Sequence, residues 1–435
     1  MWEKYIDNSH IINLLFMKKL SFTLIAILMA ITGLTSCSSQ EDEPSVAALE
    51  TKASNKVTVE EAKVNALDFV ANLKKSNTRA FSAENISIAN VKPVAFKRET
   101  RTVSSLSTDT LFYIVNFSDS CGFAIVSADK HDTPIQAFVE EGNYDYDEMD
   151  SINPGFEAFM CAMVDRAVNK KDEFTIMPKD DIDGGGGSGN SRSNKFEVMS
   201  PLLKTKWSQW NPYNTYCAGC PTGCVITAVS QICSYLQMPK NIKYQYNDEF
   251  GQATMNWEKI NQECSSNNGV LSSSDTREQV ARMMRFWGLT FGANYTSDGT
   301  SADTEEAVNK MRDEFGFNAT GLSDYNVDDV ITELKSGNKI VLMRGNGRYY
   351  HVAFVVRKYL DGHAWVVDGY IDQVKNNQES KYVHCNWGWG PQNNNGYFLS
   401  DVLNAEEAPV YDDNVTSSTR SNNFRYKLKT ATFTK

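Results

Sequence analysis

The sequence predicts an α+β protein with two folded modules joined by a flexible linker. In the first half, extended runs lie between two amphipathic helices, whereas in the second half several helices come before a series of strand-like runs. Residues 184–189 read Gly-Gly-Gly-Gly-Ser-Gly and separate the two halves. Such a stretch cannot bury apolar side chains, and 435 residues are long for one domain but sufficient for two.

The composition is that of an ordinary globular protein, with 41% hydrophobic and 22% charged residues. The formal net charge is −11. Binding to a phosphate backbone requires clustered Lys and Arg side chains, and the sequence has no basic patch of that density. We therefore expect no nucleic-acid partner.

The first residues have the pattern of an export signal. Lys18 and Lys19 precede an apolar run over residues 20–31, which has the length of a signal-peptide core and is too short to cross a bilayer as a mature helix. We predict an upstream extension and signal peptide over residues 1–37. The polar residues 38–56 are expected to form a tether.

The N-terminal module is predicted over residues 57–178. Thr58 and Glu61 have the spacing of a capping box, and a second helix is expected to begin at Pro154, a favourable first-turn residue. Considered alone, this module could be any binding module. Extended runs are predicted at residues 86–96, 111–117 and 123–127. The expected buried positions of the helices are Ala62, Ala66, Phe69, Val70 and Leu73, then Phe159, Met160, Met163, Val164 and Ala167.

The stretch 179–196 is predicted to be an exposed linker, because its Gly-, Ser- and Asn-rich sequence cannot pack. Exposed flexible segments are where proteases cut. We predict an activation cleavage between about Gly184 and Phe196, with Arg192 and Lys195 as candidate residues. The alternative is a spacer that is not cleaved.

The C-terminal module is predicted over residues 197–435, with helices first and an antiparallel sheet second. This order predicts a helical layer and a sheet layer, and the family resemblance given below implies an active-site cleft between them. Helices are expected after Cys224, after Asp275 with Gly288 as the stop, at 303–315 and at 328–336. Strands are expected at 339–343, 349–356, 363–368, 382–386 and 424–432, and Asp368 is expected to end its strand in a turn.

Cys224 has the features of a nucleophile at the start of a buried helix. Apolar residues follow it at helical spacing, and Thr222 or Gly223 would cap the helix. Unpaired N–H groups and the positive end of the helix dipole would then favour the thiolate, which is the reactive form. The alternative is a small thiol that packs at a helix start.

A thiolate nucleophile needs a base and a group that orients the base. His363 opens a strand-like run 363 − 224 = 139 residues after Cys224, and Asn386 follows after 386 − 363 = 23 more. Papain-type proteases place His and Asn about 130 to 150 residues after the nucleophile. His351 is a rival base but lies 386 − 351 = 35 residues before Asn386, and His384 would share a strand face with Asn386.

Three motifs resemble the streptopain-like cysteine proteases, a bacterial papain-fold group made as zymogens. They are Gln-Trp-Asn-Pro-Tyr-Asn at 209–214, Thr-Gly-Cys-Val at 222–225, and Gly-His-Ala at 362–364 with Asn-Trp-Gly-Trp-Gly at 386–390. The resemblance covers roughly residues 57–435. It implies a papain-like catalytic domain, preceded by a small α+β propeptide domain that folds against the enzyme and keeps it inactive.

The resemblance also implies roles for individual residues. Cys224 would be the nucleophile, with Gly223 supporting its turn, and His363 would be its base. Gln209 would donate to the oxyanion alongside the backbone N–H of Cys224. Its alternative is an ordinary polar loop glutamine.

Asn386 and Trp387 would hold the imidazole, as the third member of a triad does. Trp387 and Trp389 would cover that hydrogen bond and exclude water. The alternatives are a turn asparagine for Asn386 and core aromatic residues for the two tryptophans.

The cysteines add two predictions. Leu-Thr-Ser-Cys at 34–37 resembles a bacterial lipobox, in which Cys37 is lipidated and anchors the protein to the outer membrane, facing the periplasm or the cell surface. A signal peptide cleaved nearby is the alternative. Cys217 and Cys220 form a C-x-x-C pair, but no second pair or His cluster completes a zinc site. We therefore expect loop cysteines, either bridged or free, and neither metal nor cofactor.

The predicted function is that of an exported cysteine endopeptidase, made as an inactive zymogen, that hydrolyses extracellular proteins or peptides. Its own propeptide would be an intramolecular inhibitor, and the enzyme would stay on the lipid anchor or be released after propeptide cleavage. One alternative is a thiol amidase acting on cell-wall peptides. Another is a noncatalytic surface lipoprotein that binds protein on a protease fold.

Overall fold

The computed structural model describes residues 55–76, 86–98, 107–146, 153–176, 193–297, 299–345, 349–352, 356–359, 362–403 and 428–435. The predicted signal peptide, Cys37, most of the tether and Arg192 lie outside these residues. Within these ranges, no helix combines the length and the apolar character needed to cross a bilayer.

The N-terminal module has the predicted helices and one strand more than predicted. Helix α2 (Val59–Lys75) begins with the expected capping box, in which the N–H of Glu61 donates to Thr58 Oγ1 at 3.2 Å. Its five predicted core residues are all buried. The other elements are β1 (Ile88–Arg98), β2 (Ser107–Phe117), a 3₁₀ turn (Ser118–Ser120), β3 (Phe123–Ser127), β4 (Ile135–Val139) and α3 (Pro154–Ile176).

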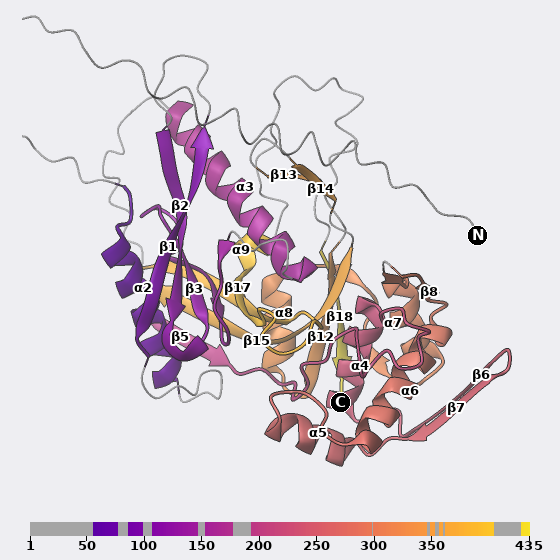
Figure 1. The fold of residues 1–435 in the computed structure, drawn as a ribbon. Coiled ribbons are helices and arrows are strands. Elements are labelled where there is room, and N and C mark those ends of the chain that lie inside the picture. The colour runs from indigo at the N-terminus through magenta and orange to yellow at the C-terminus, as the bar shows by residue number, and fades with distance from the viewer. Residues whose placement is uncertain are drawn as a thin grey trace, which may run out of the picture. The chain divides into compact units, whose positions relative to one another are not determined.

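The helices of the C-terminal module are α4 (Cys224–Leu236), α5 (Trp257–Ser266), α6 (Ser274–Thr290), α7 (Thr304–Asp313), α8 (Val327–Lys335) and the short α9 (Ser400–Leu403). Four of these helices, α4 to α7, lie together, whereas α8 and α9 pack in the cluster that contains the N-terminal module (Figure 1). Helix α5 was not predicted, nor were the hairpins β6–β7 (Asn241–Tyr246 and Glu249–Thr254) and β8–β9 (Asn294–Tyr295 and Thr300–Ser301).

The prediction that Gly288 stops a helix is wrong, because α6 continues to Thr290. Gly288 is buried inside the helix. A Cβ at this position would overlap the hydroxyl of Tyr295, so the glycine makes room for that side chain rather than ending the helix.

In the described part of the chain, strands from both modules form one sheet of twelve strands. The path runs β1-β2-β3-β4-β17-β16-β15-β12-β18-β10, and β4 pairs antiparallel with β17. The strands of the C-terminal module in this sheet are β5 (Lys195–Met199), β10 (Asn318–Ala319), β11 (Ser323–Asp324), β12 (Lys339–Gly345), β15 (His363–Lys375), β16 (Gln378–Asn386), β17 (Gly396–Leu399) and β18 (Lys429–Thr434). A separate pair is formed by β13 (Tyr349–Val352) and β14 (Val356–Tyr359).

Strand β15 is buried on both faces from His363 to Asp372, and it opens with the apolar run Ala364 to Val367. Trp365 and Val367 belong to a hydrophobic cluster with residues of the N-terminal module. Ala364 and Val366 alternate with them and belong to a second cluster with α4, α5, α6 and α7. The predicted order of helices first and sheet second in the C-terminal module is therefore confirmed. The face of β15 that carries Trp365 and Val367 packs against the N-terminal module, and the other face packs against helices α4 to α7.

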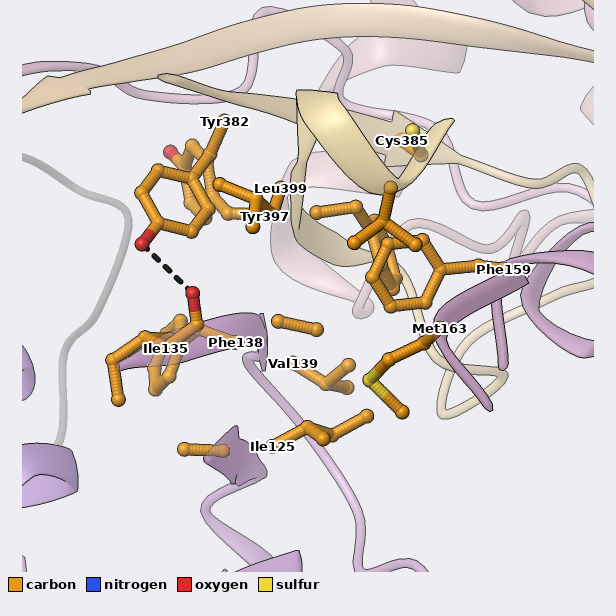
Figure 2. Packing of buried hydrophobic residues seen from close by; sticks show 14 of the residues in the cluster. Ile125, Ile135, Phe138, Val139, Phe159, Met163, Tyr382, Cys385, Tyr397 and Leu399 are labelled. Carbon is orange, nitrogen blue, oxygen red and sulfur yellow. Dashed lines mark hydrogen bonds between the residues drawn. The ribbon is translucent and has the colours of Figure 1, made fainter. Parts of the chain in front are cut away.

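The junction between the modules is a packed core rather than a loose contact. Figure 2 shows Ile135, Phe138 and Val139 of β4 beside Tyr382 of β16 and Tyr397 of β17. The Tyr382 hydroxyl donates to the Ile135 carbonyl at 2.9 Å, which satisfies a fully buried phenol. The same view places Phe159 and Met163 of α3 against this group; Phe159 and Phe398 pack edge-to-face with ring centroids 4.9 Å apart.

Candidate active site

Cys224 is the first residue of α4, as predicted. Gly223 caps the helix with φ +92°, a conformation that L side chains rarely adopt. A Cβ on Gly223 would lie 2.7 Å from the Thr300 carbonyl oxygen, so the β8–β9 hairpin closes over this turn. Only glycine fits both demands, so Gly223 fixes the turn that places Cys224 at the start of α4.

The loop that carries Gln209 is tied to the start of α4. The Thr222 N–H donates to the Gln209 carbonyl at 2.9 Å, and the hydroxyls of Thr222 and Thr227 are 2.8 Å apart. Gln209 is 6% exposed. The backbone of the predicted oxyanion donor is thus fixed close to the turn that carries Cys224.

His363 is the first residue of β15 and is 5% exposed. Its Nε2 lies 2.9 Å from the Trp387 carbonyl oxygen, which can only accept, so Nε2 carries the hydrogen. The ring stacks on Trp365 at 5.9 Å and meets Trp389 edge-on at 6.0 Å. Burial lowers the pKa of His363 to about 4, although the Trp387 carbonyl opposes this shift.

Cys224 and His363 line one pocket of about 490 Å³, which Thr300 and Arg344 also line. The cysteine comes from the helical layer and the histidine from the sheet layer, as the sequence predicts. The fold therefore brings two residues that are 139 positions apart in the sequence to the same pocket.

Asn386 does not hydrogen-bond to His363 in the described part of the chain. Its Oδ1 accepts from Gln231 Nε2 at 3.1 Å and from the Gly388 N–H at 3.3 Å, and its Nδ2 donates to the Thr205 carbonyl at 2.8 Å. The backbone carbonyl of Trp387 occupies the position at the imidazole that the sequence assigned to Asn386. The role of Asn386 in the processed protein stays a prediction.

Gln231 is a supporting residue that the sequence analysis missed. It lies on α4 two turns after Cys224 and is fully buried. Its Oε1 accepts from the Trp207 N–H at 3.0 Å, while its Nε2 donates to Asn386. One side chain therefore links the cysteine helix, the loop before Gln209 and the end of β16.

The N-terminal module lies directly on His363. Gly155, in the first turn of α3, faces the Trp387 ring, and a Cβ there would lie 3.0 Å from Cδ2 of His363. Asn153, also fully buried, donates to the Asn393 carbonyl at 2.6 Å and accepts from the Phe156 N–H at 2.8 Å. The start of α3 thus fills the space beside the imidazole.

The prediction that Asp368 ends a strand in a turn is wrong, because Asp368 lies inside β15 and is fully buried. The Asp-Gly pair marks a register shift between Val367 and Gly369 instead of a turn. Asp368 Oδ1 lies 2.6 Å from His384 Nδ1. Neither residue lines the pocket of Cys224 and His363.

No disulfide occurs among the eight cysteines of the described ranges. Burial raises the pKa of the Cys217 thiol to about 11. Cys217 therefore has the character of an inert core thiol, and of the two open alternatives the structure has the unbridged one.

Two family profiles match the chain. The Peptidase C10 family matches residues 207–398, which include Cys224, His363 and Asn386. The Spi protease inhibitor family matches residues 54–167, which cover most of the N-terminal module.

The chain is also similar to individual proteins. Streptopain of Streptococcus pyogenes is 25% identical over 382 residues, spanning 79% of this chain and 85% of streptopain. The thiol protease/hemagglutinin PrtT of Porphyromonas gingivalis is 23% identical over 331 residues, or 67% of this chain and 34% of that protein. Among solved structures, a prointerpain A fragment of Prevotella intermedia is 23% identical with a TM-score of 0.48, covering 78% of this chain and 98% of the fragment.

Proposed function

Because the chain belongs to the streptopain-like cysteine proteases, we propose that it is an exported endopeptidase zymogen that hydrolyses extracellular proteins through Cys224 and His363. The observation that carries this proposal is the pocket that these two residues share. Noncatalytic binding on a retired protease fold is disfavoured, because the chain is a cysteine-type endopeptidase by family.

In the proposed mechanism, His363 takes the proton of Cys224 and the thiolate attacks the peptide carbonyl. The Cys224 N–H and the Gln209 side chain donate to the oxyanion; one such donor is typically worth about 100- to 1,000-fold in rate. His363 then gives its proton to the leaving amine, and water hydrolyses the acyl-enzyme with His363 as base.

The N-terminal module inhibits the enzyme, and we propose that it does so at His363. While Gly155 packs beside the ring, burial keeps the pKa of His363 near 4, so the imidazole does not become the imidazolium partner of a thiolate at neutral pH. Departure of α3 would return water to the ring and raise this pKa toward its ordinary value. Asn386 could then orient the imidazole.

We propose that activation cleavage precedes β5. Lys195 pairs with Val374 in the sheet, and its ammonium contacts Asp372 at 2.8 Å. A bond within this strand is a poor protease substrate, which favours the stretch from Gly184 to Asn194 and makes Arg192 the better candidate. Edman sequencing of the processed protein tests this, and a new terminus inside either module would contradict it.

We also propose that Cys37 is lipidated and holds the protein at the outer membrane. Mass spectrometry of the membrane-extracted protein should find a diacylglyceryl adduct on Cys37, whereas an unmodified terminus near it would indicate an ordinary signal peptide.

The activity is tested by incubating the processed protein with an unfolded protein substrate and, separately, with cell-wall peptides. We expect protein hydrolysis that Cys224→Ala abolishes and Cys217→Ala retains. Hydrolysis of wall peptides with inert protein substrates would favour the amidase.

A further inference from the structure

A second buried histidine lies apart from the Cys224 pocket. His384 of β16 is 3% exposed, and its Nδ1 lies 2.6 Å from Asp368 Oδ1 on the neighbouring β15. Asp368 is fully buried, and its Oδ2 accepts from the Leu203 N–H at 2.9 Å. The carboxylate is therefore fixed from two sides and holds the imidazole in one orientation.

The other nitrogen of this imidazole faces the N-terminal module. His384 Nε2 lies 3.7 Å from Oε2 of Glu140, the residue that follows β4. The pairing of β4 with β17 and of β17 with β16 brings Glu140 to this place, since Val139 lies opposite Gly396 and Gly396 opposite Cys385. The contact therefore depends on the junction of the two modules.

Both partners have unused hydrogen-bonding capacity. Within the described ranges, neither His384 Nε2 nor Glu140 Oε1 has a hydrogen-bond partner, although both atoms are buried. Burying polar atoms without partners is costly, so their placement requires a compensating interaction, and the facing opposite charge provides it. The two residues line a pocket of about 660 Å³ with Lys206 and Asn386.

The next residue repeats the pattern. Glu141 forms an ion pair with Lys206 and accepts from Asn268 Nδ2 at 3.0 Å, and both partners belong to the C-terminal module. Two successive carboxylates of the N-terminal module thus meet donors of the C-terminal module.

We propose that His384 and Asp368 form a carboxylate-binding site, separate from the Cys224 pocket, that holds the propeptide through Glu140. Asp368 keeps Nδ1 occupied and favours the imidazolium, which leaves Nε2–H as a donor for a second carboxylate. Glu140 supplies this carboxylate in the zymogen. This inference rests on the proposed inhibitory function of the N-terminal module.

The test uses the full-length Cys224→Ala protein, which cannot process itself. The result of the test therefore does not depend on peptidase activity. The His384 imidazole signal is titrated by NMR with labelled histidine and assigned by its loss in His384→Gln. Adding Glu140→Gln should lower the pKa of His384 by about one unit or more, because it removes one of two facing negative charges. Glu60→Gln is the matched control, since Glu60 is exposed and pairs only locally with Lys63.

A second readout measures whether the site holds the propeptide. Trypsin should cut the N-terminal module of Glu140→Gln about tenfold faster than that of Glu60→Gln, since losing one member of a buried charge pair weakens docking strongly. An unchanged pKa of His384 in Glu140→Gln would overturn the proposed contact. A lowered pKa with unchanged trypsin sensitivity would overturn its role in holding the propeptide.

Discussion

Gly155 of the N-terminal module lies against His363, so close that a Cβ on Gly155 would approach Cδ2 of the imidazole to 3.0 Å. The same Cβ would overlap the side-chain ring of Trp387. The backbone carbonyl of Trp387 faces His363 Nε2. A single position without a side chain thus lets helix α3 close over the histidine.

Gly155→Ala should therefore weaken the docking of the propeptide. The added methyl group has no space beside the fully buried Trp387, so either α3 or the ring must move. We expect iodoacetamide to alkylate Cys224 of the full-length protein several-fold faster. Gly321→Ala is the control, because a Cβ there would meet only Arg312 Nη1 at 3.8 Å. Equal alkylation rates in the two variants would contradict the close packing of Gly155 as a requirement for docking.

Gly223→Ala should damage the turn before Cys224. The residue would have to keep φ +92° and sit 2.7 Å from the Thr300 carbonyl, which costs about 1 to 3 kcal/mol in backbone strain alone. We expect a lower Tm and a lower kcat/KM in the processed protein. A variant with normal Tm and activity would show that the turn tolerates a side chain.

Gln231→Leu should disconnect the cysteine helix from Asn386. It would leave the Trp207 N–H without its acceptor and remove one donor from Asn386 Oδ1, at a cost of about 1 to 3 kcal/mol in unfolding free energy. We expect kcat to fall more than KM rises. Ser234→Ala is the control, since it loses a hydrogen bond to the Gln231 carbonyl on the same helix but no link to Asn386; equal kcat losses would refute a positioning role.

The elements that were predicted correctly are those with local signals. The capping box at Thr58, the first-turn Pro154 and the helical stripe after Cys224 each depend on residues within a few positions. Strand β4 was missed because five buried residues without alternation resemble any apolar run, and only its pairing with β17 defines it. The Asp368–His384 contact joins two strands, so no local pattern reveals it.

The candidate site shows the same division. Cys224 and His363 follow from a helix start and a strand start, and the fold brings both to one pocket. The hydrogen bonds of Asn386 could not be predicted, because its partners Gln231, Thr205 and Gly388 come from three different segments.

The two buried histidines should give the zymogen a stability optimum near neutral pH. Burial lowers the pKa of His363 to about 4 in the folded zymogen. As the pH falls from about 6.5, the unfolded chain takes up a proton at His363 that the folded zymogen excludes, so stability is lost. For His384, burial also lowers the pKa, but Asp368 and Glu140 outweigh it and raise the pKa to about 9. Its contribution is complete below about 6.5 and is lost as the pH rises through 9.

Urea midpoints of the full-length Cys224→Ala protein, measured against pH, check this prediction. His384→Gln should remove the loss of stability near pH 9. The ring of Tyr397 also packs against His384. Burial raises the pKa of the Tyr397 phenol well above its ordinary value, so Tyr397 does not titrate in this range. An alkaline loss that persists in His384→Gln would assign it to another group.

The most direct test of the central claim is to treat the processed protein with a thiol-reactive peptide electrophile and to map the adduct by mass spectrometry. We predict modification of Cys224 that disappears in His363→Ala and persists in His384→Gln. Modification at another cysteine, or undiminished modification of Cys224 without His363, would contradict the assignment of this pair as the catalytic residues.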